Sequence, residues 1–174
     1  MIDLTEHYTD PVFDWFKAGV QMLGGVRFDV RGTIALFGEE PEVRGVHSPE
    51  QVTGIKVGQR CGHIHFLHTA RWTDSIQGAE IAAVAVKYGN GEVKKFPIQD
   101  LVQVANDWSS APGKPKEADV VWIGTNPSAN SSLECLRLFK YSWLNPHPDW
   151  DVSAVDLSSS RGNASYVLVA MTLE

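Results

Sequence analysis

The sequence predicts an all-β protein, an antiparallel β-sandwich of the jelly-roll type with at most short helical turns. Apolar and polar residues alternate in several short runs, which is the period of a β-strand, and glycine and proline turns separate the runs. No long amphipathic helical pattern alternates with them, which argues against a parallel α/β sheet. A chain of 174 residues, 43% hydrophobic, suits one domain with a real core and is short for two. We expect a single sandwich domain over residues 1–174, with residues 1–25 as an N-terminal extension packed on it.

The N-terminal extension is expected to hold a short helix or turn. Asp10-Pro11 fits a helix N-cap followed by proline at the first helical position. Val12, Phe13 and Phe16 would then form an apolar side that packs on the sandwich.

The first strand pattern runs from Val26 to Val30, where apolar residues alternate with charged ones. Gly32 interrupts this pattern before Ile34 and Leu36 resume it, and a glycine inside such a run often marks a bulge or bend. A polar loop is expected over Gly38–Ser48.

The stretch Cys61–Trp72, CGHIHFLHTARW, contains the most apolar strand pattern of the chain. Ile64 and Phe66 fall on one face of the expected strand and Leu67 on the other. Apolar residues on both faces are typical of a central strand rather than an edge strand. We therefore expect the other strands to be arranged around His63–Ala70.

A hairpin is expected from Ala79–Tyr88 and Glu92–Ile98, joined by Gly89-Asn90-Gly91. A two-residue turn at Asn90-Gly91 would place Lys87 opposite Lys94. A three-residue loop instead keeps apolar residues on one face, and it places Gly91 at the left-handed position that such loops favour. This register pairs Tyr88 with Glu92, Val86 with Lys94, Val84 with Phe96 and Ala82 with Ile98.

The remaining strands are expected at Val52–Val57, Val120–Ile123, Leu133–Trp143, Val152–Leu157 and Tyr166–Leu173. Proline-containing loops are expected at Pro112–Glu117 and at Asn145–Asp149, the latter crossing an end of the sheet.

Charge and composition exclude several classes of partner. A net charge of −6 and scattered basic residues argue against nucleic-acid binding and against binding to an anionic membrane surface. Met1–Asp10 lacks the pattern of a signal peptide, and no apolar run reaches membrane-spanning length. The compartment stays open, because an excised module could be extracellular or periplasmic. Cys61 and Cys135 allow one bridge, but two thiols are the expected state.

Six segments in order resemble a bacterial family of β-sandwich modules similar to galactose-binding-like and NPCBM-like domains. The segments are GGVRFDVRGTIAL, GIKVGQRCGHIHFLHTARW, AVKYGNGEVKKFPI, VWIGTNP, LRLFKYSWLNPHPDWDVSAVDL and YVLVAMTLE. Relatives of this kind occur beside glycoside hydrolases and in large proteins of unknown function. Lys56 and His63 depart from the family pattern. The resemblance implies a jelly roll and, by analogy, carbohydrate binding; a structural calcium ion is left open, and no other cofactor is expected.

The three histidines of Cys61–Trp72 form the pattern H-x-H-x-x-H. In a strand, His63 and His65 share one face and His68 points to the other. A catalytic zinc ion normally has three protein ligands, so this split favours structural histidines over a metal site. His68 shares the face of Ile64, and we expect a buried neutral imidazole hydrogen-bonded to backbone.

Tryptophans in or near expected loops are the candidate ligand contacts. Sugar binding combines a flat aromatic ring with planar polar groups that bond hydroxyls. Single indoles can equally close the ends of a sandwich. The candidate ligand-binding residues are Arg71, Trp72, Trp108, Trp143, Asn145, His147 and Trp150.

The leading functional hypothesis is a non-catalytic binding module with carbohydrate as its ligand. No nucleophile elbow, phosphate-binding glycine loop or zinc motif is present, so we expect no catalytic residue. A first alternative is a protein-interaction or structural domain beside a neighbouring domain, which a contiguous exposed apolar patch would favour over a loop-rimmed aromatic groove. A weaker alternative is a metal-dependent hydrolase that uses His63 and His65.

Overall fold

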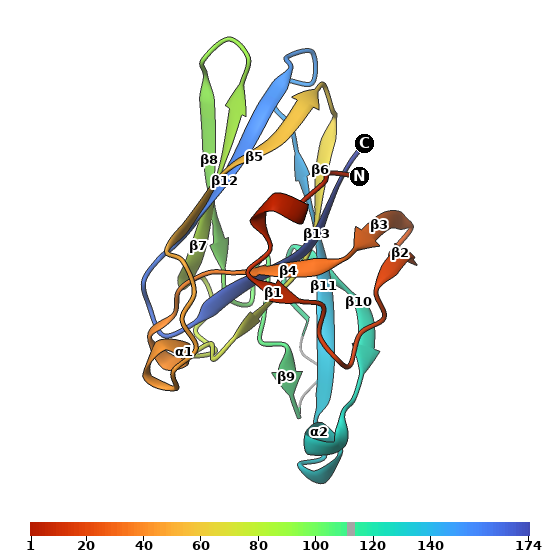
Figure 1. Ribbon diagram of the computed structural model, residues 1–174, viewed down its shortest axis with the longest axis vertical. Helices are drawn as coiled ribbons and strands as arrows, with labels where there is room; N and C mark the ends of the chain where they lie inside the picture. The colour runs from red at the N-terminus through yellow and green to blue at the C-terminus, as the bar shows by residue number, and fades with distance from the viewer. Residues whose placement is uncertain (111–113) are drawn as a thin grey trace.

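The protein is an antiparallel β-sandwich, as a computed structural model describing residues 1–110 and 114–174 shows (Figure 1). The larger sheet has the order β1 (Asp10–Pro11), β4 (Gly32–Ala35), β13 (Ser165–Leu173), β6 (His63–Arg71), β11 (Cys135–Leu144) and β10 (Ala118–Gly124), with β9 (Trp108–Ser109) also paired to β11. The smaller sheet has the order β5 (Gln51–Gln59), β12 (Val152–Ser159), β7 (Glu80–Tyr88) and β8 (Val93–Gln99). A separate hairpin consists of β2 (Gly19–Leu23) and β3 (Val26–Val30).

Helical structure is confined to short pieces: a 3₁₀ turn at Thr5–His7, α1 (Glu39–Val43) and α2 (Pro127–Ser131). The prediction of an all-β sandwich with at most short helical turns is therefore confirmed. The jelly-roll topology in particular stays a prediction.

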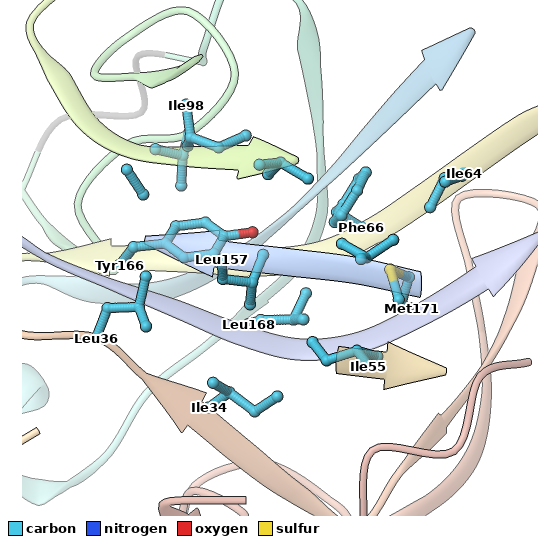
Figure 2. Close-up of a cluster of buried hydrophobic side chains, with 14 of the residues drawn as sticks. Ile34, Leu36, Ile55, Ile64, Phe66, Ile98, Leu157, Tyr166, Leu168 and Met171 are labelled. Carbon is cyan, nitrogen blue, oxygen red and sulfur yellow. The ribbon is translucent and has the colours of Figure 1, made fainter. Parts of the chain in front are cut away.

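The main core lies between the two sheets (Figure 2). Phe66 and Leu168 project into it from the larger sheet, and Ile55 and Leu157 from the smaller one. All four side chains are fully buried or nearly so. Burial of this apolar surface is what holds the two sheets together.

Strand β6 is central, as its two apolar faces predicted. It pairs with β13 on one side and with β11 on the other. Phe66 belongs to the main core, whereas Leu67 belongs to a second apolar cluster on the outer face of the larger sheet. Only the first and last residues of β6 are incompletely buried.

The β7–β8 hairpin has the predicted three-residue loop. Val86 pairs with Lys94, Val84 with Phe96 and Ala82 with Ile98. The Tyr88 backbone N–H donates to the Glu92 carbonyl at 2.9 Å, and Gly91 has a φ of +90°. The register and the left-handed glycine are therefore confirmed.

The second apolar cluster lies beneath the β2–β3 hairpin. Phe28 and Val30 of β3 pack there against Leu67 and Leu138 of the larger sheet. The chain leaves this hairpin for the larger sheet at Gly32, where an added Cβ would lie 2.5 Å from Tyr8 Cγ. The predicted strand at Val26–Val30 is confirmed, and the interruption that follows it falls at Arg31, one residue before Gly32 begins β4.

The helix start predicted at Asp10-Pro11 is wrong. These two residues are extended and pair with Thr33 and Gly32 as β1. Proline is compatible with an edge strand because it lacks only an N–H that would face outward. A turn follows, in which the Phe16 N–H donates to the Phe13 carbonyl at 3.0 Å. The alternative of a turn, with Phe13 and Phe16 packed on the sandwich, is the one that holds.

Loop expectations hold in part. The loop expected at Gly38–Ser48 contains α1, whose first turn is rich in glutamate. Of the loop expected at Pro112–Glu117, Pro112 and Gly113 lie outside the described residues, and β10 begins just after it at Ala118. Cys61 and Cys135 are free thiols, as expected, and burial raises the pKa of Cys61.

Candidate functional site

A cleft of about 520 Å³ opens where β6 ends, beside β9 and the segment that leads to α2. We call it the end cleft. In Figure 1 these elements lie toward the foot of the view, away from the β7–β8 loop. Its walls combine three indoles with carboxylates, amides and one guanidinium: Asp14, Trp15, Arg71, Trp72, Asn106, Asp107, Trp108, Asn126, Glu134 and Leu136.

The inner wall of the end cleft is built around an ion pair between Arg71 and Asp107. Arg71 Nε–H donates to Asp107 Oδ2 at 3.1 Å, and the guanidinium lies 4.8 Å from the centre of the Phe13 ring. The Asp107 N–H bonds the Ala70 carbonyl at 2.7 Å, which fixes this carboxylate beside the end of β6. Burial raises the pKa of Asp107, while the charge of Arg71 acts in the opposite direction. The pair is therefore a rigid polar element of the wall.

Trp72 follows Arg71 in a left-handed backbone conformation, with a φ of 54°. For a bulky residue this conformation costs about 1–2 kcal/mol, and such strain is concentrated at ligand-binding and active sites. The conformation turns the chain out of β6 and places the indole on the rim of the cleft. The Arg44 guanidinium lies 6.0 Å from the indole centre.

Trp108 and Glu134 form another part of the cleft wall. The two-residue strand β9 pairs with the start of β11, with Trp108 opposite Leu136. The Trp108 indole N–H donates to Glu134 Oε2, which fixes the plane of the ring. Asn126 caps α2 by accepting the Ala129 N–H at 2.8 Å. This wall is therefore assembled from three separate chain segments.

An aromatic row continues the cleft over the outer face of the larger sheet. Trp15 stacks on Phe13 with ring centres 4.4 Å apart and on Trp122 with centres 5.1 Å apart. Phe13 also contacts the Arg71 guanidinium. Trp15 is half-buried and lines the cleft.

His68 holds the segment that leads to Asp107. Its Nε2 lies 3.0 Å from the Gln103 carbonyl and its Nδ1 lies 3.0 Å from the Tyr166 hydroxyl. A carbonyl only accepts, so Nε2 carries the proton and Nδ1 accepts the Tyr166 O–H. The side chain is fully buried, and desolvation lowers its pKa to about 3. The predicted neutral histidine bonded to backbone is confirmed.

His63 and His65 lie on the opposite face of β6 from His68, as the alternation predicted, with ring centres 5.8 Å apart. His65 Nδ1 lies 2.8 Å from Ser142 Oγ, and Nε2 lies 3.0 Å from Glu174 Oε2. Burial lowers the pKa of His65. Within residues 1–110 and 114–174, no three histidine, cysteine, aspartate or glutamate side chains are arranged to hold a metal ion.

The predicted ligand-binding residues fall into two groups. Arg71, Trp72 and Trp108 line the end cleft. Trp143, Asn145, His147 and Trp150 lie near the other end of β6, because Leu144 pairs with His63. At the rise of an extended strand, the nine residues of β6 separate the two ends by about 26 Å. The structure therefore does not bring the seven residues together.

The second group is engaged mainly in internal contacts. Trp143 stacks on Phe96 with ring centres 5.1 Å apart, at the margin of the main core. The buried Asn145 amide accepts from the Tyr88 hydroxyl and the His147 N–H and donates to the Cys61 and His147 carbonyls.

His147 and Trp150 stack on each other with ring centres 3.9 Å apart, and Tyr88 contacts both rings edge-on. Trp150 also borders a shallow hollow with Arg60 and Asp149. These contacts are those expected of rings that close an end of the sandwich.

Sequence reasoning did not single out Asp14, Trp15, Asn106, Asn126 or Glu134 as candidate site residues. Trp15 lies between Phe13 and Phe16, and this concentration of aromatic residues in one turn could have marked Trp15 as a candidate. The other four are common polar residues in loops or short elements, and only the fold brings them to one cleft.

Searches of protein-family models, curated proteins and solved structures found no match to this chain. The resemblance to galactose-binding-like modules therefore stays a prediction. In the described part of the chain, no helix has the length and apolar character needed to cross a membrane.

Proposed function

We propose that the protein is a non-catalytic module that binds carbohydrate in the end cleft. The observation that carries this proposal is the convergence of Trp15, Trp72 and Trp108 with planar polar groups on the walls of one cleft. A loop-rimmed aromatic groove is the feature expected of glycan binding rather than of a protein-interaction surface.

The chemistry of the walls suits a sugar. An indole offers a flat apolar surface to the C–H face of a pyranose ring, and half-buried indoles can do so without unfolding the site. Arg71, Asn106 and Asn126 supply planar donors and acceptors for hydroxyl groups. The volume of about 520 Å³ lies within the range of about 300–1,000 Å³ that is typical of small-ligand sites. The resemblance to galactose-binding-like modules points to the same ligand class by analogy.

The test is a glycan array of plant, algal and bacterial polysaccharides, followed by calorimetric titration of any ligand found. Trp72→Ala and Trp108→Ala should each weaken binding at least tenfold, which corresponds to about 1.4 kcal/mol. Trp150→Ala is the matched control, since Trp150 is also a half-buried indole but lies at the other end of β6. An array without any binder, or equal loss in all three variants, would sink the proposal.

A protein-interaction or structural domain is the second candidate. Val20 and Met22 lie on the same side of β2 and are 52% and 68% exposed. Exposed apolar side chains at neighbouring positions of one face favour an interface. Light scattering over a range of concentrations should then show self-association that Met22→Glu abolishes. A concentration-independent monomer would count against an interface between copies.

A further inference from the structure

The walls of the end cleft carry more negative than positive charge. Among the described residues that line it, Asp14, Asp107 and Glu134 are acidic and Arg71 alone is basic. Arg71 and Arg137 both act on the charge of Asp107, so the excess negative charge belongs to Asp14 and Glu134. A cleft lined mainly by one sign of charge concentrates the electrostatic field and selects ligands by charge. The charge on the cleft walls therefore limits which charge the ligand can carry, although it does not specify the order of its sugars.

Arg71 is already the partner of a buried carboxylate. Its Nε–H donates to Asp107, which is 5% exposed, and its guanidinium lies over the Phe13 ring. Drawing the guanidinium toward an anionic ligand would weaken the pairing of this buried charge, which is costly. A guanidinium has five N–H donors, so Arg71 can still bond a neutral hydroxyl group.

A second hollow of about 280 Å³ continues the end cleft. The two hollows share Asp14, Arg71 and Trp72, so these three residues border both of them. The second hollow adds the carboxylate of Asp10 and no basic side chain among the described residues that line it. A ligand longer than one sugar unit would therefore pass from one carboxylate-bearing hollow into the other.

We propose that the ligand is a chain of uncharged or amino-bearing sugars lying over Trp72 through both hollows, and that chains of uronic acids or sulfated sugars are rejected. This proposal rests on the proposed function of the end cleft. Uncharged hydroxyl and acetamido groups can bond the carboxylates, and an ammonium group is attracted by them. A carboxylate or sulfate on the ligand would face these like charges. Arg44 lies 6.0 Å from the Trp72 indole centre, but it is already paired with Glu40.

The experiment compares matched glycans that differ only in charge. Calorimetric titrations use hexagalacturonate against its fully methyl-esterified form, and the hexamer of N-acetylglucosamine against that of glucosamine. The glycan array supplies the same comparison for any other backbone that binds. We expect the uncharged or amino-bearing form to bind at least tenfold more tightly than the acidic form, and added salt to weaken only the amino-bearing form.

Asp14→Asn with Glu134→Gln is the charge-neutralising variant, and the amide oxygen introduced in place of the Glu134 carboxylate can still accept the Trp108 indole N–H. A thermal unfolding measurement is made first, to check that this variant is folded. It should narrow the preference against acidic glycans at least threefold. The preference is the ratio of the affinities for the uncharged and acidic forms in the same variant, so a loss of hydroxyl bonding common to both forms cancels. Equal or tighter binding of an acidic form, or an unchanged preference in the variant, would overturn this proposal alone. Absence of binding by every glycan class would instead overturn the proposed function.

Discussion

His68 makes the stability of the sandwich depend on pH in a way that one substitution can isolate. Its pKa is about 3 in the folded protein, against an ordinary value of 6.5. As the pH falls below 6.5, the unfolded chain takes up a proton that the folded protein refuses until about pH 3. The folded state therefore loses stability as the pH falls through this range, and the contribution of neutral His68 is fully present only above pH 6.5.

The magnitude follows from the size of the pKa difference. Each pH unit between the two pKa values is worth about 1.36 kcal/mol, so lowering the pH from 6.5 to 4.5 should cost up to about 2.7 kcal/mol through this group. Asp100 and Asp107 have raised pKa values because of burial, and they act in the opposite direction near and above pH 3.8. A comparison of the wild type with a His68 variant removes the effect of both aspartates on the pH dependence, because the two proteins share them.

His68→Asn is the informative variant. The Asn side chain can still accept the Tyr166 O–H, but the Gln103 carbonyl loses its donor, which should cost about 1–3 kcal/mol at neutral pH. Urea unfolding followed by tryptophan fluorescence at pH 7.5 and 4.5 gives the free energies. The gap between wild type and variant should shrink by up to about 2.7 kcal/mol at the lower pH.

The control for this experiment is His47→Asn, because the His47 side chain is 75% exposed. It should leave the pH dependence close to that of the wild type. If the stabilities of wild type and His68→Asn change in parallel with pH, the histidine is not held neutral and the reasoning fails.

Two further substitutions test the backbone at the cleft and the second core. Trp72→Gly should unfold at a higher temperature than Trp72→Ala, by a margin equivalent to about 1 kcal/mol, because glycine adopts the left-handed conformation without strain. Equal melting temperatures would show that Trp72 is not strained. Leu67→Ala should cost about 2–5 kcal/mol in urea unfolding, because it opens a cavity beneath the β2–β3 hairpin. The exposed Leu144→Ala, at 67% exposure, should cost under about 0.5 kcal/mol, and a similar loss in both variants would show that the second core contributes little.

The parts of the fold that the sequence could predict are those set by local chemistry. The β7–β8 register follows from alternation and from the turn residues, which lie within twenty positions of one another. The central position of β6 follows from apolar residues on both of its faces. His68 follows from the same alternation, which separates it from His63 and His65.

The parts that the sequence could not predict depend on contacts between distant segments. Asp10-Pro11 has the local pattern of a helix start, but pairing with Thr33 gives it an extended conformation. Strand β2 was missed because its apolar Val20 and Met22 face solvent, so its sequence does not show the buried apolar face by which strands were recognised.

The end cleft shows the same limit. Arg71 and Trp72 could be chosen as candidates because a strand visibly ends there. Trp15 and Glu134 reach the same cleft from segments far away in the sequence, and no local pattern links them. Conversely, Trp150 was chosen as a candidate because it is a tryptophan in an expected loop, yet the fold places it near the other end of β6.

The central place of β6 also bears on how the protein is made. The His68–Tyr166 hydrogen bond joins residues 98 positions apart, so β6 obtains its last partner only when β13 is synthesised. At ribosomal rates of about 5–20 residues per second, that delay is about 5–20 seconds. During it, a strand that is apolar on both faces has an unpaired edge, which is the kind of segment that pairs with other nascent chains. Arg71 and Trp72, at the end of β6, acquire their final setting only after almost the whole of residues 1–174 has emerged.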